Sequence, residues 1–140
     1  EKAVLIGASM GSTCALRYAA LNPTDIACVV GLLSVCNLTV AYDNDLGSNR
    51  AGIGTAYGVT YPTPLPANSD PATMTSTLAS IPIFLHHSSD DAYWTTSSAG
   101  ANFVTATGAE TQDVGALGHT DTSIAAANIP DIISFIRANT

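Results

Sequence analysis

A serine stands between two glycines near the start of the chain, in the segment Gly7-Ala8-Ser9-Met10-Gly11. This G-x-S-x-G pattern after a short apolar run is typical of a tight turn between a strand and a helix, which pushes the serine hydroxyl outward. We expect glycine at both positions because side chains there would collide with the strand and the helix. The turn would also bring the backbone N–H of Met10 to a helix N-terminus, where it can hold a developing oxyanion.

A serine nucleophile needs a base that takes its proton and an acid that orients the base. Of the three histidines, His119 follows a predicted strand on a loop from which it can reach across the strand ends, so we predict it as the base. His86 and His87 end another predicted strand before an acidic turn, where packing or hydrogen bonding to that turn is the favoured role. The acid is Asp90 or Asp91, and the residues by themselves leave both open.

Alternating strands and helices must position these side chains. Short apolar runs predict buried strands over residues 2–6, 26–35 and 81–86, and a fourth strand is predicted over residues 111–117. Helices are predicted over residues 10–21, 71–79, 95–107 and 124–138, with Asn22-Pro23 and Gly108 as stop signals. This alternation implies parallel strands joined by crossovers. We therefore predict an α/β fold with a mostly parallel sheet of about four strands flanked by helices.

Residues 37–70 differ from the rest because they carry most of the Gly, Asn, Asp and Pro. We predict a long irregular excursion near the active site, within a single domain of residues 1–140, since apolar structure resumes directly after it. Aromatic residues in and near this region could line a substrate pocket or simply pack on the core, and both interpretations stay open. These candidates are Tyr42, Tyr57, Tyr61 and Leu65 in the excursion, and Tyr93 and Trp94 after the acidic turn.

The charge balance excludes some classes of partner. The net charge is −7, and the four basic residues, Lys2, Arg17, Arg50 and Arg137, form no cluster that could replace phosphate counterions. Nucleic acid is therefore excluded as a partner, and an anionic membrane surface is disfavoured. No apolar run approaches the roughly 18 residues that a membrane span needs. The acidic, Ser/Thr-rich composition slightly favours a secreted or extracellular protein, but the compartment stays unknown because the sequon at residues 37–39 is too common to decide it.

The three cysteines, Cys14, Cys28 and Cys36, all lie in apolar surroundings in the sequence. We predict that they are small buried apolar residues rather than partners in a disulfide or ligands of a metal.

Three motifs together resemble the C-terminal half of an α/β-hydrolase of the esterase/lipase type. They are the serine elbow, the strand from Ile81-Pro82 into the segment His87-Ser88-Ser89-Asp90-Asp91, and Gly118-His119 before the last helix. Their order, Ser then Asp then His, is the order of that family. In the family this strand usually ends in His-Gly-x-x-Asp, so that matching from His87 makes Asp91 the acid, with Asp90 as the alternate counted from His86. Ser88 stands where the family prefers glycine.

The resemblance implies hydrolysis of carboxylic esters through an acyl-enzyme, with a small-molecule ester as substrate, no metal and no organic cofactor. Ser9 would be the nucleophile, His119 the base and Asp91 the acid, with Met10 N–H at the oxyanion. A serine peptidase of the same fold would use the same residues. A catalytically inactive hydrolase-like interaction module is the other alternative, and loss of activity in Ser9→Ala would separate it from an enzyme.

The N-terminal half of an α/β-hydrolase, with its second oxyanion donor, is not in this sequence, which begins in mid-pattern at Glu1. We therefore expect a truncated form of the fold, produced by processing or as a fragment. The apolar strand at residues 2–6 would then be an unpaired sheet edge, and such an edge tends to pair. The expected partners are a second copy, giving a homo-oligomer, or the missing N-terminal half.

Overall fold

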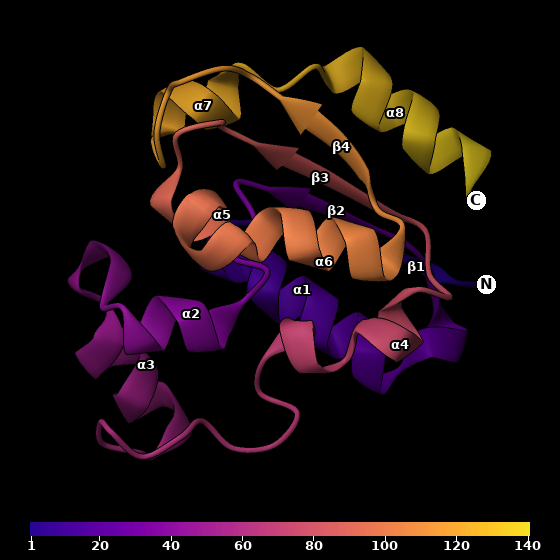
Figure 1. Cartoon of the computed structure of the whole chain (residues 1–140). Coiled ribbons are helices and arrows are strands. Elements are labelled where there is room, and N and C mark those ends of the chain that lie inside the picture. The colour runs from indigo at the N-terminus through magenta and orange to yellow at the C-terminus, as the bar shows by residue number, and fades with distance from the viewer.

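Four parallel strands form one sheet in the order β1-β2-β3-β4, in a computed structural model that describes residues 1–140 (Figure 1). The strands are β1 (Ala3–Ala8), β2 (Ile26–Leu32), β3 (Ile83–His87) and β4 (Glu110–Asp113). The prediction of a parallel α/β sheet is confirmed. β2 and β4 end earlier than predicted, at Leu32 and Asp113. Leu33 follows β2 with a positive φ of 47°, which ends the extended backbone there.

Helices cover both faces of this sheet, so that the chain forms three layers (Figure 1). On one face, α1 (Met10–Leu21), α4 (Thr75–Leu78) and α6 (Ala99–Thr107) pack on the sheet through a core that includes Leu16, Leu78 and Phe103. On the other face, α8 (Ile129–Ala138) packs through Ile132 and Phe135. The chain therefore buries its central strands from two sides.

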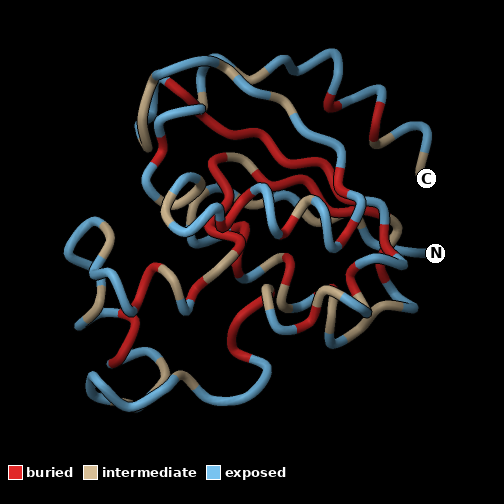
Figure 2. Tube along the Cα trace, in the orientation of Figure 1, coloured by how far each residue is buried: buried red, intermediate tan, exposed pale blue.

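Alternation along the strands explains this arrangement. In β3, Leu85 belongs to the core under α1 and α6, whereas Phe84 points to α8, where its ring centroid lies 5.5 Å from that of Phe135. Figure 2 shows β2 and β3 buried along most of their length. The edge strands differ, because β4 is mostly exposed and polar and β1 leaves Ile6 with 60% of its surface exposed. The prediction that the first strand is buried on both faces is therefore wrong in this chain.

Three of the predicted helices are interrupted. The helix predicted over residues 95–107 begins earlier as α5 (Ala92–Thr95), passes through a 3₁₀ turn (Thr96–Ser98) and continues as α6. Ser97 and Ser98 adopt left-handed φ values of 55° and 54°, which an α-helix does not allow. The helix predicted over 124–138 is divided into α7 (Asp121–Ala125) and α8, and the one over 71–79 into a 3₁₀ turn (Pro71–Thr73) and α4.

The prediction of an irregular excursion over residues 37–70 is wrong for its first half. This part contains α2 (Leu38–Asp43), a 3₁₀ turn (Leu46–Ser48) and α3 (Arg50–Tyr57), which share a small core of their own. Asn37 begins α2 because its side-chain oxygen accepts a 2.9 Å hydrogen bond from Val40 N. Residues 58–70 contain no regular element, and at their end the Asp70 carboxylate accepts hydrogen bonds from the backbone of Leu38 and Thr39.

The cysteines are all free, and Cys28 and Cys36 are buried as predicted. Burial raises the pKa of both thiols. Cys14 is exposed on α1, so the prediction of burial is wrong for that residue. None of the helices combines the length and apolar character that crossing a bilayer requires.

Candidate active site

Ser9 occupies the turn between β1 and α1. Its φ of 51° and ψ of −121° lie outside the regions that a side chain normally allows, a strain of the order of 1–3 kcal/mol that the surrounding contacts must offset. Ser9 N donates a 2.8 Å hydrogen bond to Leu32 O at the end of β2. Ser12 stabilises the same turn, because its backbone N–H and its hydroxyl both donate hydrogen bonds to Ser9 O, at 3.0 and 2.6 Å.

The two glycines of the elbow are not equivalent. A Cβ on Gly7 would overlap the backbone of Gly11 and Ser12, so the close approach of β1 to α1 requires glycine there. A Cβ on Gly11 would have nothing within 4 Å. The expectation that a side chain at Gly11 would collide is therefore wrong.

Ser9, His119 and Asp91 form one continuous chain of hydrogen bonds. Ser9 Oγ lies 2.7 Å from His119 Nε2, and His119 Nδ1 lies 2.7 Å from Asp91 Oδ2. An ionised Asp91 carboxylate would only accept, which would place the imidazole proton on Nδ1 and leave Nε2 to accept from the serine hydroxyl. The Asp91 side chain is 1% exposed and that of His119 23%. The imidazole is therefore partly open to solvent, whereas the carboxylate that it contacts is buried.

The two neighbouring aspartates have different surroundings. Asp91 directs one oxygen to His119 and uses the other, Oδ1, to accept a 2.9 Å hydrogen bond from Tyr93 N at the start of α5. Asp90 is exposed, and its Oδ1 accepts hydrogen bonds from Ser88 Oγ and Gly118 N rather than from the imidazole. Hydrogen bonds from the Ser88 hydroxyl and from Gly118 N lower the pKa of Asp90 below its ordinary value. The structure thus brings Asp91, and not the alternate Asp90, to His119.

His86 and His87 lie at the end of β3 but outside this chain of hydrogen bonds. His86 is fully buried and neither ring nitrogen has a hydrogen-bond partner. The His87 ring stacks on Trp94 with centroids 3.9 Å apart and planes 4° apart. Burial lowers the pKa of both imidazoles, which favours their neutral forms. Of the two roles predicted for them, packing is the one that the contacts support.

Tyr93 lies beside the histidine. Its ring centroid is 4.6 Å from that of His119, and its hydroxyl donates a 2.9 Å hydrogen bond to Leu46 O and accepts one of 2.7 Å from Asn49 Nδ2. The ring therefore contacts the imidazole while the hydroxyl is held by the turn between α2 and α3. Tyr93 is one of the residues predicted to line a substrate pocket or to pack on the core, and nothing in the sequence indicates this contact with His119.

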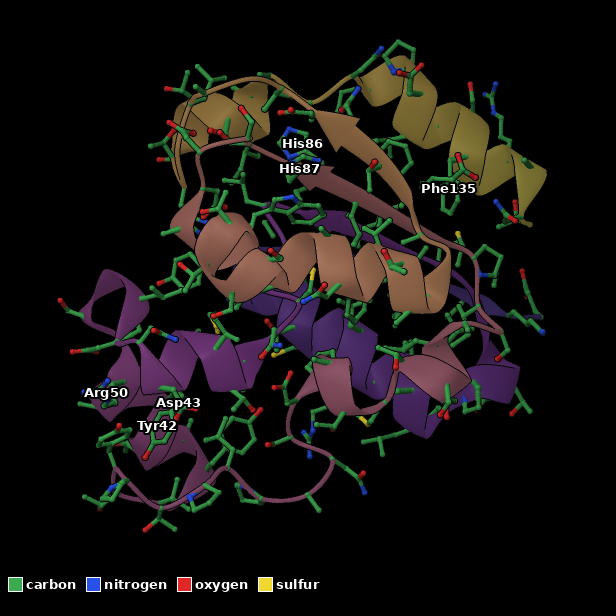
Figure 3. All side chains as sticks on the ribbon, in the orientation of Figure 1. Tyr42, Asp43, Arg50, His86, His87 and Phe135 are labelled. Carbon is green, nitrogen blue, oxygen red and sulfur yellow. The ribbon has the colours of Figure 1, made fainter.

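The other two aromatic candidates lie elsewhere. Trp94 packs against the main core, and its indole leaves no room for a side chain on Gly100. Tyr61 lines a hollow of about 390 Å³, where the Arg50 guanidinium lies 4.1 Å from its ring centroid. Figure 3 shows Tyr42 and Arg50 of this region at the α2–α3 end of the molecule, apart from His86 and His87. None of the residues that line the hollow belongs to the Ser9–His119–Asp91 chain.

Met10 is the first residue of α1, directly after Ser9. The first N–H groups of a helix have no acceptor within the helix, so Met10 N–H is free to bind an anion beside the serine hydroxyl. No group of three or more His, Cys, Asp or Glu side chains is arranged to hold a metal ion. The chemistry that the arrangement supports is attack by an activated serine on a polarised carbonyl group.

No protein-family model and no curated protein matches the sequence. Solved structures do match it. The chain superposes on a ferulic acid esterase with a TM-score of 0.64 at 16% identity, covering 96% of this chain and 50% of that one. For carboxyl esterase 2 from the fungus Tuber melanosporum the TM-score is 0.65 at 14% identity, covering 98% and 54%. For the alpha/beta hydrolase GrgF from Penicillium sp. sh18 it is 0.62 at 11% identity, covering 97% and 63%.

These comparisons show that the chain has the α/β-hydrolase fold, as the motifs led us to expect. The chain spans between 50% and 63% of the length of these three structures, so that the fold seen here corresponds to part of theirs. The low identities make this a statement about the fold, and activity has to be argued from the site itself.

Proposed function

We propose that this chain is a serine hydrolase that cleaves carboxylic esters through an acyl-enzyme. The observation that carries the proposal is the pair of 2.7 Å hydrogen bonds from Ser9 Oγ to His119 and from His119 to the buried Asp91. The fold supports it as well, since similar structures include a ferulic acid esterase and a carboxyl esterase.

In the proposed reaction, Ser9 Oγ attacks the carbonyl carbon of the ester while His119 Nε2 takes the hydroxyl proton. The carbonyl oxygen becomes an oxyanion that accepts a hydrogen bond from Met10 N–H. The C–O bond to the alcohol then breaks, and His119 gives its proton to the departing alkoxide. Water attacks the acyl-enzyme in the same manner, with His119 again as base, and releases the carboxylic acid and free Ser9.

Asp91 acts through His119 in this scheme. Its carboxylate holds the imidazole in the tautomer that accepts at Nε2 and stabilises the imidazolium that forms in each half of the reaction. Because the Asp91 side chain is only 1% exposed, water screens this interaction little. The second hydrogen bond, from Tyr93 N, fixes the carboxylate so that Oδ2 stays directed at the histidine.

The test is hydrolysis of p-nitrophenyl acetate by the wild type, by Ser9→Ala and by Ser134→Ala. Ser134 is an exposed serine on α8 whose hydroxyl bonds only Pro130 O, so its loss should leave turnover unchanged. We expect Ser9→Ala to lower kcat by at least about 10³-fold. A fluorophosphonate should add one covalent label to the wild type and to Ser134→Ala but none to Ser9→Ala.

Other outcomes identify the alternatives. Cleavage of a p-nitroanilide with comparable efficiency would favour a serine peptidase that uses the same residues. Equal and negligible turnover in all three proteins, with no label on Ser9, would contradict the proposal. The remaining interpretations would then be a chain that needs the N-terminal half with its second oxyanion donor, or an inactive interaction module, for which the exposed β1 edge with its Ile6 side chain offers a surface.

A further inference from the structure

Ser88, which stands where the family pattern has glycine, places its hydroxyl between the acidic turn and the loop before His119. The residue is fully buried. Its Oγ lies 2.6 Å from Asp90 Oδ1 and 2.7 Å from Gly115 O, and it accepts a 2.9 Å hydrogen bond from Leu117 N. A glycine at this position could make none of these contacts.

Asp90 adds a second connection to the same loop. Its Oδ1 accepts a 2.7 Å hydrogen bond from Gly118 N, the residue directly before His119, in addition to the one from Ser88. Hydrogen bonds to an ionised acceptor are stronger than those between neutral groups. The Ser88 hydroxyl and Gly118 N–H also lower the pKa of Asp90, so the carboxylate keeps its charge at a pH where an ordinary aspartate begins to lose it.

Backbone contacts complete the attachment of residues 114–118, which we name the histidine loop. Val114 N donates to His87 O at 3.0 Å, and Ser89 N donates to Gly115 O at 3.1 Å. Gly115 and Gly118 have φ values of 82° and 65°, a path that other residues follow only with strain. The histidine loop is therefore held by the segment that leads directly to Asp91.

We propose that Ser88 and Asp90 are positioning residues for His119. The imidazole must meet Ser9 on one side and Asp91 on the other, each at 2.7 Å, and these partners belong to different elements. Because Leu117 and Gly118 are held from the turn that carries Asp91, the base and its acid form one unit that docks against the elbow. The kinetic part of this inference rests on the proposed function, whereas the geometric part does not.

The kinetic test compares Ser88→Ala, Ser88→Gly and Asp90→Asn with Ser80→Ala. Ser80 is a suitable control because it is an exposed serine whose hydroxyl bonds only Thr77 O, at the C-terminal end of α4. We expect kcat for p-nitrophenyl acetate to fall by about 10- to 100-fold in the first three variants, with KM unchanged, because misplacing a base slows the chemical step more than binding. Ser80→Ala should match the wild type.

A spectroscopic test needs no turnover. In the wild type, the His119 Nδ1 proton that bonds Asp91 should give a low-field NMR signal that exchanges slowly with water, together with ¹⁵N shifts of a single tautomer. Ser88→Ala and Asp90→Asn should broaden that signal and mix the tautomers, whereas Ser80→Ala should not. Thermal unfolding followed by circular dichroism verifies that each variant is folded. Asp90→Asn, at an exposed site, keeps the test usable if Ser88→Ala does not fold.

The outcomes separate the two proposals. If folded Ser88→Ala and Asp90→Asn both retain kcat within about twofold and leave the imidazole signals unchanged, the positioning role is overturned. If the wild type hydrolyses no ester, the proposed function fails, and the NMR signals alone then decide whether these residues place His119.

Discussion

The Tyr93 side chain makes two separate sets of contacts, one through its ring and one through its hydroxyl. The ring lies against the imidazole of His119, and the hydroxyl takes part in hydrogen bonds with Leu46 O and Asn49 Nδ2. The first contact covers one side of the His119 imidazole, and the second connects α5 to the turn between α2 and α3. Two substitutions can therefore separate an effect on activity from an effect on stability.

Tyr93→Phe keeps the ring and removes both hydroxyl contacts. We expect it to lower the free energy of unfolding by about 1–2 kcal/mol, with a smaller effect on kcat than Tyr93→Ala. Tyr93→Ala also frees the imidazole, and kcat should fall by about tenfold or more. Urea denaturation and steady-state hydrolysis of p-nitrophenyl acetate measure the two effects. Equal kcat values for the two variants would show that the ring does not restrict His119.

The buried histidines make stability depend on pH. Burial lowers the pKa of His86 and His87 in the folded chain, so that on acidification the unfolded chain binds protons first. The free energy of unfolding should therefore fall as the pH decreases from about 6.5, the ordinary value for histidine, toward the lower pKa of the folded state. Above pH 7 the contribution of these groups should be constant.

His86→Leu tests the origin of this dependence. The imidazole has no hydrogen-bond partner to lose, so at pH 7.5 the variant should be as stable as the wild type or more stable, by up to about 1 kcal/mol. Between pH 6.5 and pH 5 its stability should decline less steeply. Urea titrations of both proteins at several pH values supply the comparison. Parallel curves would assign the pH dependence to other groups.

Ser9 and His119 could be located from the residues because each follows a recognisable strand, whereas the choice of Asp91 over Asp90 needed the resemblance to a known family. Ser9 follows the first apolar run, and the two motifs with Asp91 and His119 follow later strands. Because the C-terminal ends of parallel strands lie on the same side of a sheet, the proximity of these residues was predictable. The contacts of Ser88 and Tyr93 were not predictable, because they depend on the path of two loops whose conformation no local pattern specifies.

At the scale of elements, caps and breaks were harder to recognise than apolar runs. Asn and Asp favour turns as well as helix starts, so the composition of residues 37–70 suggested irregular chain where Asn37 in fact begins α2. Serine gives no signal for the left-handed φ of Ser97 and Ser98, which separate α5 from α6. The break before α8 did have a signal, since Pro130 lies in its first turn.

The elbow provides a matched pair of substitutions at this scale. Gly7→Ala forces a methyl group into the backbone of α1 and should lower the free energy of unfolding by about 1–3 kcal/mol, with loss of ester hydrolysis. In Gly11→Ala the added methyl group would contact no neighbouring atom, and alanine favours the α-helix more than glycine does. The substitution should therefore raise the free energy of unfolding by about 0.5–1 kcal/mol. Thermal unfolding of the two variants measures both. Equal destabilisation would mean that β1 and α1 approach each other differently.

At the scale of the whole molecule, the sheet ends in two unlike edges. β4 presents polar and acidic residues, which discourage pairing, whereas β1 is an apolar edge with Ile6 60% exposed. Met10, Tyr18 and Leu21 of the adjoining α1 are exposed as well. We therefore expect the isolated chain to associate with a second copy through β1, as its sequence suggested.

Ile6→Lys should weaken this association by about tenfold or more, because it places a charge beside the pairing edge. Ile129→Lys is the matched control, since Ile129 is a similarly exposed isoleucine that belongs to α8 and not to a strand. Sedimentation equilibrium of the three proteins over a range of concentrations gives the dissociation constants. A wild type that sediments as a monomer at every concentration would contradict the expectation.

The Ser9–His119 hydrogen bond joins residues that are 110 positions apart in the chain. During synthesis Ser9 therefore leaves the ribosome long before His119 has been added to the chain. On the proposed mechanism, a growing chain, or one released unfinished before residue 119, carries an unactivated hydroxyl that cannot attack cellular esters. The order of the residues along the chain thus delays reactivity until the last helices can fold, and regain of activity after dilution from denaturant would report the final step of assembly.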